Sequence, residues 1–465
     1  MKIFNTVTRK KEEFVPLVPG KIGIYVCGPT VYNYFHIGNA RPFIVFDTLR
    51  RYLEFRGFEV NYVQNFTDID DKMIRRANEE GITVDELATR FIAEYFVDTK
   101  GLGIREATAH PRATDCMPEI IKLVETLIAT GFAYEVDGDV YFETGKFERY
   151  GKLSGYHLDE LESGSRVDVD ERKRNPEDFA LWKSQKPQEP AWESPWGLGR
   201  PGWHIECSAM AMKYIGDTID IHCGGQDLVF PHHENEIAQS EAATGKPFAR
   251  YWMHNGFINV DNQKMSKSAG NFFMVRDIIC KFDYEIIRFF MLSSQYRSPI
   301  NFADTLLEQA QNGLARIYNC LSNLEFLKEN EQIQAKPGVN IAAALEQCRK
   351  EFNDAMDDDL NTADAISVIF EGVREINSLV NAETQANLAD VDASIAFIRD
   401  LGAVLGIAQR QASTDVDDEV ERLLEERVKA RKEKNWALSD QIRDQLKAMG
   451  IVLEDTPQGV KWKKA

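Results

Sequence analysis

The sequence has no long apolar run and no cysteine spacing of the kind that marks a disulfide framework. No stretch of about 18 consecutive apolar residues occurs in the sequence, so we expect no membrane-spanning segment. The N-terminal residues have no apolar core of the kind that marks a signal peptide. The seven cysteines are odd in number, scattered, and never spaced as Cys-x-x-Cys, which argues against disulfides and a closed structural zinc knuckle. These absences predict a cytoplasmic protein.

The chain also has fewer basic than acidic residues. Its 55 Lys and Arg residues against 74 Asp and Glu residues give a formal net charge of −19. A protein that binds nucleic acid nonspecifically needs a basic surface. Any contact with RNA must therefore use local basic patches on an acidic body.

The size and the hydrophobic content are sufficient for several domains. The 465 residues predict about three domains, and the hydrophobic share of 43% is ample for several packed cores. Near the N-terminus, alternating apolar residues predict a strand over 21–27, helical spacing predicts a helix over 39–56, and a second strand follows over 60–66. In such a βαβ unit the start of the helix lies at the carboxyl end of the first strand, where α/β sheets bind nucleotides.

A second half of the same fold follows later in the chain. We expect a helix over 203–214, a strand over 218–222, a tight turn over 223–225, a helix over 228–243 and a strand over 251–260.

Residues 72–200 separate the two halves, and we interpret them as an insertion. They contain two helical patterns, over 83–99 and 117–130, a β-like stretch over 132–142, and a Pro- and Trp-rich segment over 187–201 that predicts an irregular loop.

From residue 304 onward the pattern is almost entirely helical. A loop over 330–340 and a linker over 411–416 divide it, and a charged helical pair with Trp436 in its middle precedes a short tail containing Pro457.

Two phosphate-binding patterns stand out. Lys264 and Lys267 lie three residues apart in Lys-Met-Ser-Lys-Ser, and two ammonium groups at that spacing can bracket a triphosphate. Most Lys-x-x-Lys stretches are solvated loops, but here an upstream partner exists. Residues 36–39 (His-Ile-Gly-Asn) open a helix just after a strand. Together the two patterns resemble the ATP site of class I aminoacyl-tRNA synthetases.

Further motifs extend this resemblance along the whole chain. They are 25–32 (Tyr-Val-Cys-Gly-Pro-Thr-Val-Tyr), 67–72 (Thr-Asp-Ile-Asp-Asp-Lys), 201–208 (Pro-Gly-Trp-His-Ile-Glu-Cys-Ser), 230–236 (Phe-Pro-His-His-Glu-Asn-Glu) and 450–456 (Gly-Ile-Val-Leu-Glu-Asp-Thr). In this order they resemble the cysteinyl-tRNA synthetases. The resemblance implies an α/β fold: a Rossmann-like class I catalytic core with a connective insertion, an all-α helical bundle and a small C-terminal anticodon-binding module.

The expected domain boundaries follow from this resemblance. They are 1–71 for the first half of the nucleotide-binding domain, 72–200 for the insertion, 201–261 for its second half, 262–303 for the KMSKS loop and stem-contact region, 304–412 for the helical bundle and 413–465 for the anticodon-binding module. Two positions depart from the family pattern. Asn39 replaces a histidine, and its amide is a donor of similar reach. Cys223 replaces a glycine, where a side chain would either crowd the adenosine pocket or point away.

A metal site is the next expectation. From spacing alone, His232 and Glu236 share one helix face, a pair more typical of an N-terminal-turn histidine beside a solvated acid than of a metal site. The resemblance adds Cys27 and Cys207 and implies one Zn²⁺ per chain held by all four residues. It also implies that Thr67, Trp203 and His222 form the substrate pocket. For Trp203 alone, core packing is the alternative.

The resemblance further implies an ATP-dependent reaction with Mg²⁺. His36 and Asn39 would hold phosphate oxygens, Lys264 and Lys267 would stabilise the transferred charge, and Gly38 and Asp227 would contact ATP. The implied partners are L-cysteine, ATP and tRNA(Cys), and we expect a monomer.

In the C-terminal module the resemblance implies anticodon contacts by Arg431, Trp436, Asp440 and Asp455. The alternative for these four residues is an ordinary charged helical hairpin with a buried tryptophan.

Two other functions share part of this pattern. A cysteine ligase that joins activated cysteine to an amino sugar in mycothiol synthesis would share the ATP and zinc residues, but it lacks the C-terminal module. A non-catalytic RNA-binding or zinc-storage protein would not require His36, Lys264 and Lys267.

Overall fold

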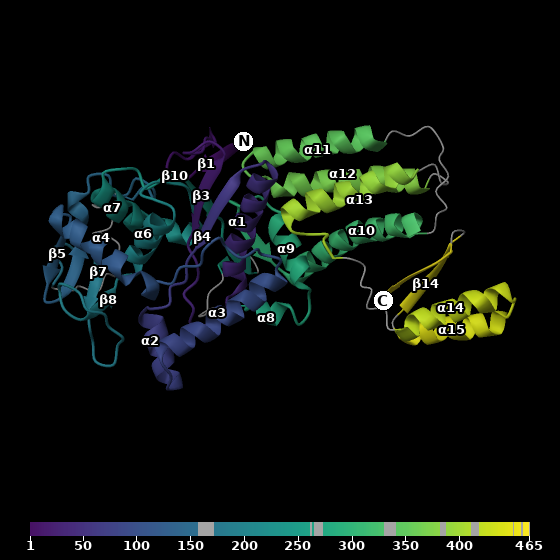
Figure 1. Cartoon of the computed structure of the whole chain (residues 1–465), viewed down its shortest axis with the longest axis horizontal. Helices are drawn as coiled ribbons and strands as arrows, with labels where there is room; N and C mark the ends of the chain where they lie inside the picture. Colours follow the sequence, from purple (N-terminus) through teal and green to yellow (C-terminus); the bar gives the residue numbers. More distant parts are fainter. Residues whose placement is uncertain are drawn as a thin grey trace. The chain divides into compact units, whose positions relative to one another are not determined.

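The computed structural model forms two compact units (Figure 1). The first contains Met1–Asn312, Phe352–Ile366 and Val404–Ile407, and the second contains Gly313–Glu351, Ser367–Ala403 and Ala408–Ala465. The described residues are 1–156, 172–260, 263–264, 273–329, 341–381, 387–410, 418–449, 451–456 and 459–464. The expected loop over 330–340, the expected linker over 411–416 and Lys267 lie outside them, and Lys264 is described only in its backbone.

A parallel sheet is the centre of the first unit. Its strand order is β10 (Ala249–Asn255), β9 (Ile219–Gly225), β3 (Lys21–Val26) and β4 (Glu59–Gln64), and every pair is parallel. Strands β3, β9 and β10 are buried almost throughout, as expected for a parallel sheet covered on both faces, whereas the edge strand β4 is buried only over its last three residues. The chain moves from β3 to β4 on one side and from β9 to β10 on the other. The carboxyl ends of β3 and β9 therefore form the switch point where such sheets bind ligands.

Helix α1 (Ile37–Phe55) connects β3 to β4, which confirms the expected βαβ unit. It begins two residues earlier than expected, directly after the extended backbone of His36. Its buried face is dense in large apolar residues and packs against β4, β9 and β10. The first turn of α1 is thereby held at the carboxyl edge of the sheet.

The second half of this fold differs from expectation in three places. Strand β9 continues through Gly225 and pairs with β10, so the tight turn expected over 223–225 is wrong. Helix α7 (Glu234–Thr244) begins later than expected, because Val229–His233 forms a π-helical turn before it. Pro231 has no backbone N–H and therefore cannot donate the hydrogen bond that a regular helix would need there. The strand expected over 251–260 is interrupted after Asn255 and resumes as β11 (Ile258–Val260).

Residues 72–200, which we expected to form an insertion, hold a helical part and a sheet of their own. Helices α3 (Val84–Gly101) and α4 (Met117–Ala129) confirm the two expected helices, whereas α2 (Asp71–Glu80), with Asp70 as its N-cap, was not expected. The antiparallel sheet is β5 (Ala133–Val136), β6 (Asp139–Phe142), β7 (Phe179–Ser184) and β8 (Gly199–Pro201). Strand β8 lies within the expected irregular loop, because pairing with β7 orders it.

Smaller elements complete the first unit. Strands β1 (Lys2–Asn5) and β2 (Lys10–Glu13) form a hairpin, and β12 (Gln263–Lys264), β11 and β13 (Ile300–Phe302) form a three-stranded sheet. Helices α6 (Trp203–Tyr214), α8 (Val275–Ile278) and α9 (Tyr284–Leu292) complete it, and α6 has the expected bounds.

The later part of the chain is helical, as expected. Its helices are α10 (Asp304–Glu329), α11 (Ile341–Asp357), α12 (Thr362–Asn381), α13 (Leu388–Leu405), α14 (Asp418–Lys432) and α15 (Trp436–Ala448). The expected C-terminal tail is a β-hairpin, β14 (Ile451–Thr456) and β15 (Gly459–Lys464). In the part of the chain that is described, no helix is long and apolar enough to cross a membrane.

Candidate functional site

Four buried side chains meet at the switch point of the central sheet. Cys27 follows β3, Cys207 lies on α6, His232 lies in the π-helical turn and Glu236 lies in the first turn of α7. Their potential ligand atoms all lie within 4.8 Å of one another, and each side chain is buried. The structure thus brings together the four residues that the resemblance named for zinc.

The spacing of these donors suits a tetrahedral ion. The two Sγ atoms of Cys27 and Cys207 are 3.8 Å apart, which equals the edge of a tetrahedron with metal–sulfur bonds of ~2.3 Å. Glu236 Oε1 lies 3.6 Å from Cys27 Sγ and 3.0 Å from His232 Nε2. Two thiols, one imidazole and one carboxylate form a donor set that fits Zn²⁺.

The cluster also shifts the protonation of its members. Hydrogen bonding from Cys27 lowers the pKa of the Cys207 thiol to about 6, whereas burial raises the pKa of the Cys27 thiol well above its usual value. Burial opposes ionisation of Glu236, but the neighbouring His222 and His232 lower its pKa to about 2. Burial likewise opposes protonation of His232, and Glu236 still raises its pKa to about 10. Without a metal, the His232 imidazolium thus balances part of the negative charge of the Cys207 thiolate and the Glu236 carboxylate, and a divalent cation would take the place of its proton.

A shell of histidines surrounds the cluster. His222 Nε2 lies 2.8 Å from Glu236 Oε2, and His233 Nε2 lies 3.3 Å from Cys27 Sγ. These two histidines with Cys27 and Glu236 form a second group whose ligand atoms lie within 4.8 Å of one another. His222 thus holds the carboxylate from behind, and it does not line the cavity described below.

Three histidines near the cluster were missed by sequence reasoning. His204 Nδ1 lies 2.9 Å from His232 Nδ1, and His233 Nδ1 lies 2.7 Å from His254 Nε2. A signal existed for two of them, because His233 is next to His232 and His204 lies one helical turn before Cys207. His254 had no local signal, since only the pairing of β10 with β9 brings it there.

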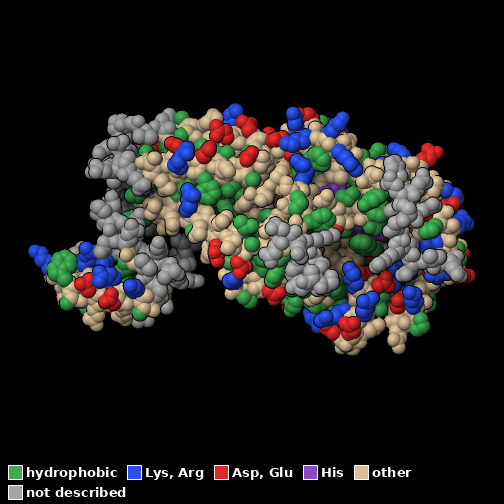
Figure 2. All heavy atoms as spheres, turned by 180° about the vertical axis from the view of Figure 1, so that it is seen from behind, with side chains coloured by type: hydrophobic (Ala, Val, Ile, Leu, Met, Phe, Trp, Pro, Cys, Tyr) green, Lys and Arg blue, Asp and Glu red, His purple; other side chains and the backbone are tan. Residues whose placement is uncertain are grey.

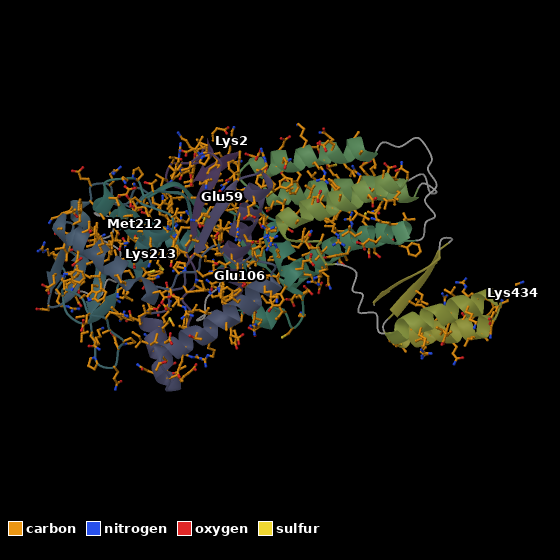
Figure 3. The ribbon with its side chains drawn as sticks, in the orientation of Figure 1. Lys2, Glu59, Glu106, Met212, Lys213 and Lys434 are labelled. Atoms are coloured by element: carbon orange, nitrogen blue, oxygen red, sulfur yellow. The ribbon has the colours of Figure 1, made fainter. Side chains whose placement is uncertain are left out.

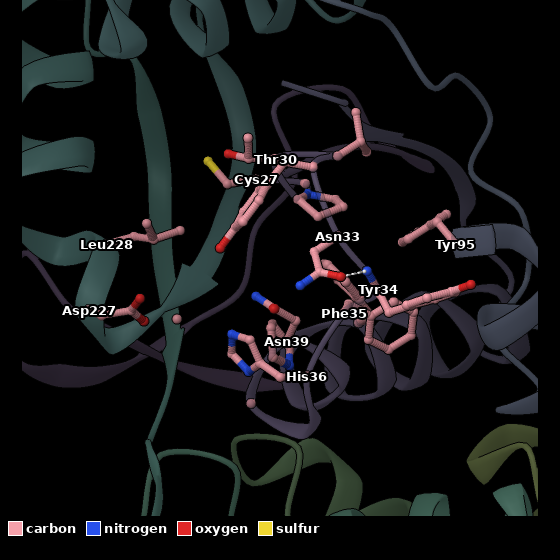
Figure 4. Close-up of a pocket in the computed structure, with 18 of the residues that line it drawn as sticks. Cys27, Thr30, Asn33, Tyr34, Phe35, His36, Asn39, Tyr95, Asp227 and Leu228 are labelled. Atoms are coloured by element: carbon pink, nitrogen blue, oxygen red, sulfur yellow. Dashed lines mark hydrogen bonds between the residues drawn. The ribbon is translucent and has the colours of Figure 1, made fainter. Parts of the chain in front are cut away.

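A cavity of about 400 Å³ extends from Cys27, one member of the four-residue cluster, to the start of α1 (Figure 4). His36, Gly38 and Asn39 line it at the helix start, and Asp227 lines it from the segment after β9. Figure 4 shows His36 and Asn39 side by side, with Asp227 and Leu228 across the cavity from them and Cys27 at its far end.

The other two expected pocket residues, Trp203 and Thr67, lie in different places. Trp203 lines the cavity, is 42% exposed and stacks on His232 with ring centroids 4.4 Å apart, so the core-packing alternative is wrong. Thr67 is buried, donates a hydrogen bond of 3.1 Å to Glu206 Oε2, and does not line the cavity. Cys223 is fully buried and also lies off the cavity wall, so it points away.

The four residues expected to contact the anticodon lie far along the chain from the residues that line this cavity. Trp436 begins α15 and is 57% exposed, so the alternative of a buried tryptophan is wrong. Asp440 is exposed one turn later and lies 3.3 Å from Arg443 Nη1. Arg431 lies near the end of α14, and Asp455 lies on β14, where only its backbone is described.

The turn between α14 and α15 carries Lys434 (Figure 3). On the face that Figure 2 presents, Lys and Arg side chains gather on this module with acidic side chains among them. An exposed aromatic ring beside basic side chains suits contact with an unpaired base.

Comparison with known proteins agrees with this arrangement. Residues 13–312 match the class I (C) tRNA synthetase catalytic domain, residues 351–409 match the DALR domain, and residues 413–462 match the cysteinyl-tRNA ligase anticodon binding domain. The chain is 58% identical over 466 aligned residues to the cysteine–tRNA ligase of Clostridioides difficile (strain 630), with all of both chains covered.

Solved structures with low sequence identity share the fold. Mycobacterium tuberculosis methionyl-tRNA synthetase in complex with methionyl-adenylate matches with a TM-score of 0.61 at 16% identity, covering 83% of this chain and 89% of its own. A putative arginyl-tRNA synthetase from Campylobacter jejuni matches with a TM-score of 0.56 at 13% identity, covering 84% and 93%. The family models and the full-length relative together establish that this chain belongs to the cysteinyl-tRNA synthetases, within the class I aminoacyl-tRNA synthetases.

Proposed function

We infer that this chain is a cysteine–tRNA ligase, which activates L-cysteine with ATP and transfers it to tRNA(Cys). The observation that carries this inference is the full-length match at 58% identity, with a matching anticodon module at residues 413–462. We also propose that it acts as a monomer in the cytoplasm.

Selection of cysteine is the demanding step. Serine and cysteine differ only by oxygen for sulfur, and shape alone separates such near-isosteres by roughly 1–3 kcal/mol. We propose that Cys27, Cys207, His232 and Glu236 hold one Zn²⁺, which supplies a soft Lewis acid that prefers a thiolate to an alcohol. The short donor distances and burial of these four side chains support the proposal. Trp203, stacked on His232, would close the amino-acid pocket, with His222 and Thr67 behind it.

Adenylate formation would use the other end of the cavity. The cysteine carboxylate would attack the α-phosphate of ATP, and the bond between the α- and β-phosphates would break to release pyrophosphate. Mg²⁺ bound with ATP would offset the charge of the phosphates. His36 and Asn39 would hold phosphate oxygens beside the backbone N–H groups of the first turn of α1, with Gly38 allowing a close approach. Lys264 and Lys267 would stabilise the charge on the leaving pyrophosphate. Asp227, on the opposite wall, would contact the ribose. Positioning and charge stabilisation suffice, because the attacking group is supplied by the substrate.

Transfer to tRNA would follow without a covalent enzyme intermediate. A ribose hydroxyl of the terminal adenosine attacks the activated carbonyl and releases AMP. Recognition of the anticodon would fall to Trp436 by stacking on a base, and to Arg431, Asp440 and Asp455 by hydrogen bonds to base edges.

The two rival functions lose support. A cysteine ligase of mycothiol synthesis would not need the anticodon module, which this chain retains. A non-catalytic binding protein would not need the phosphate-binding patterns.

One set of assays tests the proposal. ATP–pyrophosphate exchange should require cysteine and should be far weaker with serine, and the same protein should charge tRNA(Cys). Metal analysis of the purified protein should give one zinc per chain. Cysteine-independent exchange, or exchange without charging, would contradict the function, whereas full activity in a zinc-free preparation would contradict only the metal assignment.

A further inference from the structure

A buried arginine lies directly behind the phosphate-binding turn. Arg41 belongs to α1, two residues after Asn39, and it is fully buried. Its Nη1 donates hydrogen bonds to the carbonyl oxygens of Gly256 at 2.7 Å and Phe257 at 2.9 Å. Its Nη2 donates to Ser298 O at 2.7 Å and more weakly to Gln295 O at 3.4 Å. One guanidinium therefore joins α1 to two backbone segments that are far apart in sequence.

Both segments lead into the small sheet that carries Lys264. Gly256 and Phe257 lie directly before β11, and Gln295–Ser298 lies directly before β13. Strand β11 pairs with β13 on one side and with β12 on the other, where Asn259 is opposite Lys264. Arg41 thus fixes the starts of two of the three strands in this sheet.

The two segments that Arg41 joins are closely packed against each other. A Cβ atom added at Gly256 would lie 2.6 Å from backbone atoms of Arg297 and Ser298, so the two segments touch through their backbones. The extended backbone at His36 also forms a β-bridge with Met274, and Ile37 N donates to Phe273 O at 3.0 Å. Residues 35–41 are therefore tied to the chain both before and after the Lys264 motif.

The chemistry of the contact is unusual for a buried arginine. In the part of the chain that is described, its partners are carbonyl oxygens and no carboxylate, and burial lowers the pKa of Arg41 to about 10. A lysine retains the charge but presents one nitrogen, which cannot span both segments as the planar fork does.

We propose that Arg41 is a positioning residue for adenylate formation, which aligns the sheet carrying Lys264 with His36 and Asn39. The inference rests on the proposed function, because it assigns Arg41 a role in that reaction. Small displacements of reacting groups reduce rates steeply. Loss of the hydrogen bonds from Arg41 to the two segments therefore lowers the rate of adenylate formation, while cysteine still binds at the Cys27 end of the cavity.

The test compares Arg41→Lys with Arg288→Lys in the full-length protein. Arg288 is also fully buried, donates to the backbone carbonyls of Leu102, Gly103 and Leu405, and does not line the cavity. Unlike Arg41, it also pairs with a carboxylate on α1, that of Asp47, at 2.6 Å, so its replacement is the more severe structural change. Both variants are expected to lower Tm. For each, kcat and KM for ATP and cysteine are measured by ATP–pyrophosphate exchange, normalised to active sites by the burst of adenylate formed in a single turnover, together with zinc content.

We expect Arg41→Lys to lower kcat by ~10- to 100-fold, with the KM for cysteine and the zinc content near those of the unaltered protein. Arg288→Lys should retain kcat per active site. Gly256→Ala, which pushes the same two segments apart from the other side, should reproduce the loss of kcat and covers the case in which Arg41→Lys does not fold.

Three outcomes decide the matter. Equal kcat for Arg41→Lys, Gly256→Ala and the unaltered protein would overturn the proposal. Equal losses of kcat in Arg41→Lys and Arg288→Lys would make Arg41 merely structural and would also overturn it. Absence of cysteine-dependent exchange in the unaltered protein would instead contradict the proposed function itself.

Discussion

The buried four-residue cluster and the C-terminal helical pair differ in how far their side chains are exposed. Cys27, Cys207, His232 and Glu236 are all buried, and each lies within hydrogen-bonding or near-ligand distance of another. In the C-terminal pair, Trp436 is 57% exposed at the start of α15. The buried core between α14 and α15 is small, with Leu423, Ile442 and Leu446 at its centre.

The difference fits the size of what each region is proposed to recognise. A single amino acid fits inside a protein, and distinguishing sulfur from oxygen requires dry, fixed donors that exchange no contacts with water. An RNA base arrives on a large, charged polymer, so its contacts must lie on the surface and depend on stacking and local charge. We expect changes in the buried cluster to abolish function and changes in the exposed pair to weaken it by degrees.

The largest effect should come from removing a cluster thiol. In Cys207→Ala we expect zinc content to fall to a small fraction and cysteine-dependent exchange to reach background. Loss of an outer partner of a metal ligand alone costs ~10- to 100-fold in affinity, and a direct ligand should cost more. Metal analysis by mass spectrometry measures the first effect. Cys116→Ala, a buried thiol away from the cluster, is the matched control and should retain zinc. Full zinc occupancy in Cys207→Ala would remove Cys207 from the site.

Lys267→Ala should have the next largest effect. Its charge should matter most as pyrophosphate leaves, so kcat for adenylate formation should fall by ~100- to 1000-fold while the KM for cysteine changes little. Pre-steady-state measurement of adenylate formation checks this. Lys246→Ala, which removes a lysine paired with Asp217 on the surface, should be unaffected. An unchanged rate with a raised KM for ATP would make Lys267 an anchor of the ground state.

Truncation after residue 412 tests whether the two regions are separable. Cysteine activation does not require tRNA in the proposed mechanism, so exchange should be retained. Charging of tRNA(Cys) should fall by more than the ~1–3 kcal/mol expected from one lost stacking contact, because the other base contacts are lost with it. Exchange and charging are measured on the same truncated protein. Equal charging by the truncated and full-length proteins would make the C-terminal module structural and would reopen the amino-sugar ligase.

The smallest effect should come from the exposed ring alone. In Trp436→Ala, kcat/KM for charging should fall by roughly 5- to 150-fold, which corresponds to ~1–3 kcal/mol of base stacking. Exchange should not change. Leu438→Ala, another exposed apolar side chain in the first turn of α15, is the control and should charge normally. Unaltered charging by Trp436→Ala would return this residue to an ordinary surface position.

Sequence patterns were sufficient for the regular elements and for the motifs themselves. Apolar periodicity located β3, α1, α6 and the helices after residue 304, because burial of one face imposes a period that local sequence records. Apolar periodicity gave the wrong element where strand pairing or a proline determined the local backbone. Cys223–Gly225 reads as a turn, but pairing with β10 keeps these residues in a strand, and Pro231 delayed the start of α7 by interrupting its backbone hydrogen bonds.

The sequence by itself determined the family, the two phosphate-binding patterns and the kinds of side chain available for a metal. Only the tertiary structure decided which of those side chains meet. Cys27 follows β3 and Cys207 lies on α6, 180 residues further along the chain, yet the packing of these elements brings their sulfurs to 3.8 Å. Tertiary packing also places His254 beside His233 and buries Cys223 in the core. It brings the Arg41 guanidinium to the backbone segments that precede β11 and β13. These are non-local contacts, which no local pattern encodes, because they depend on how strands and helices pack once each has formed.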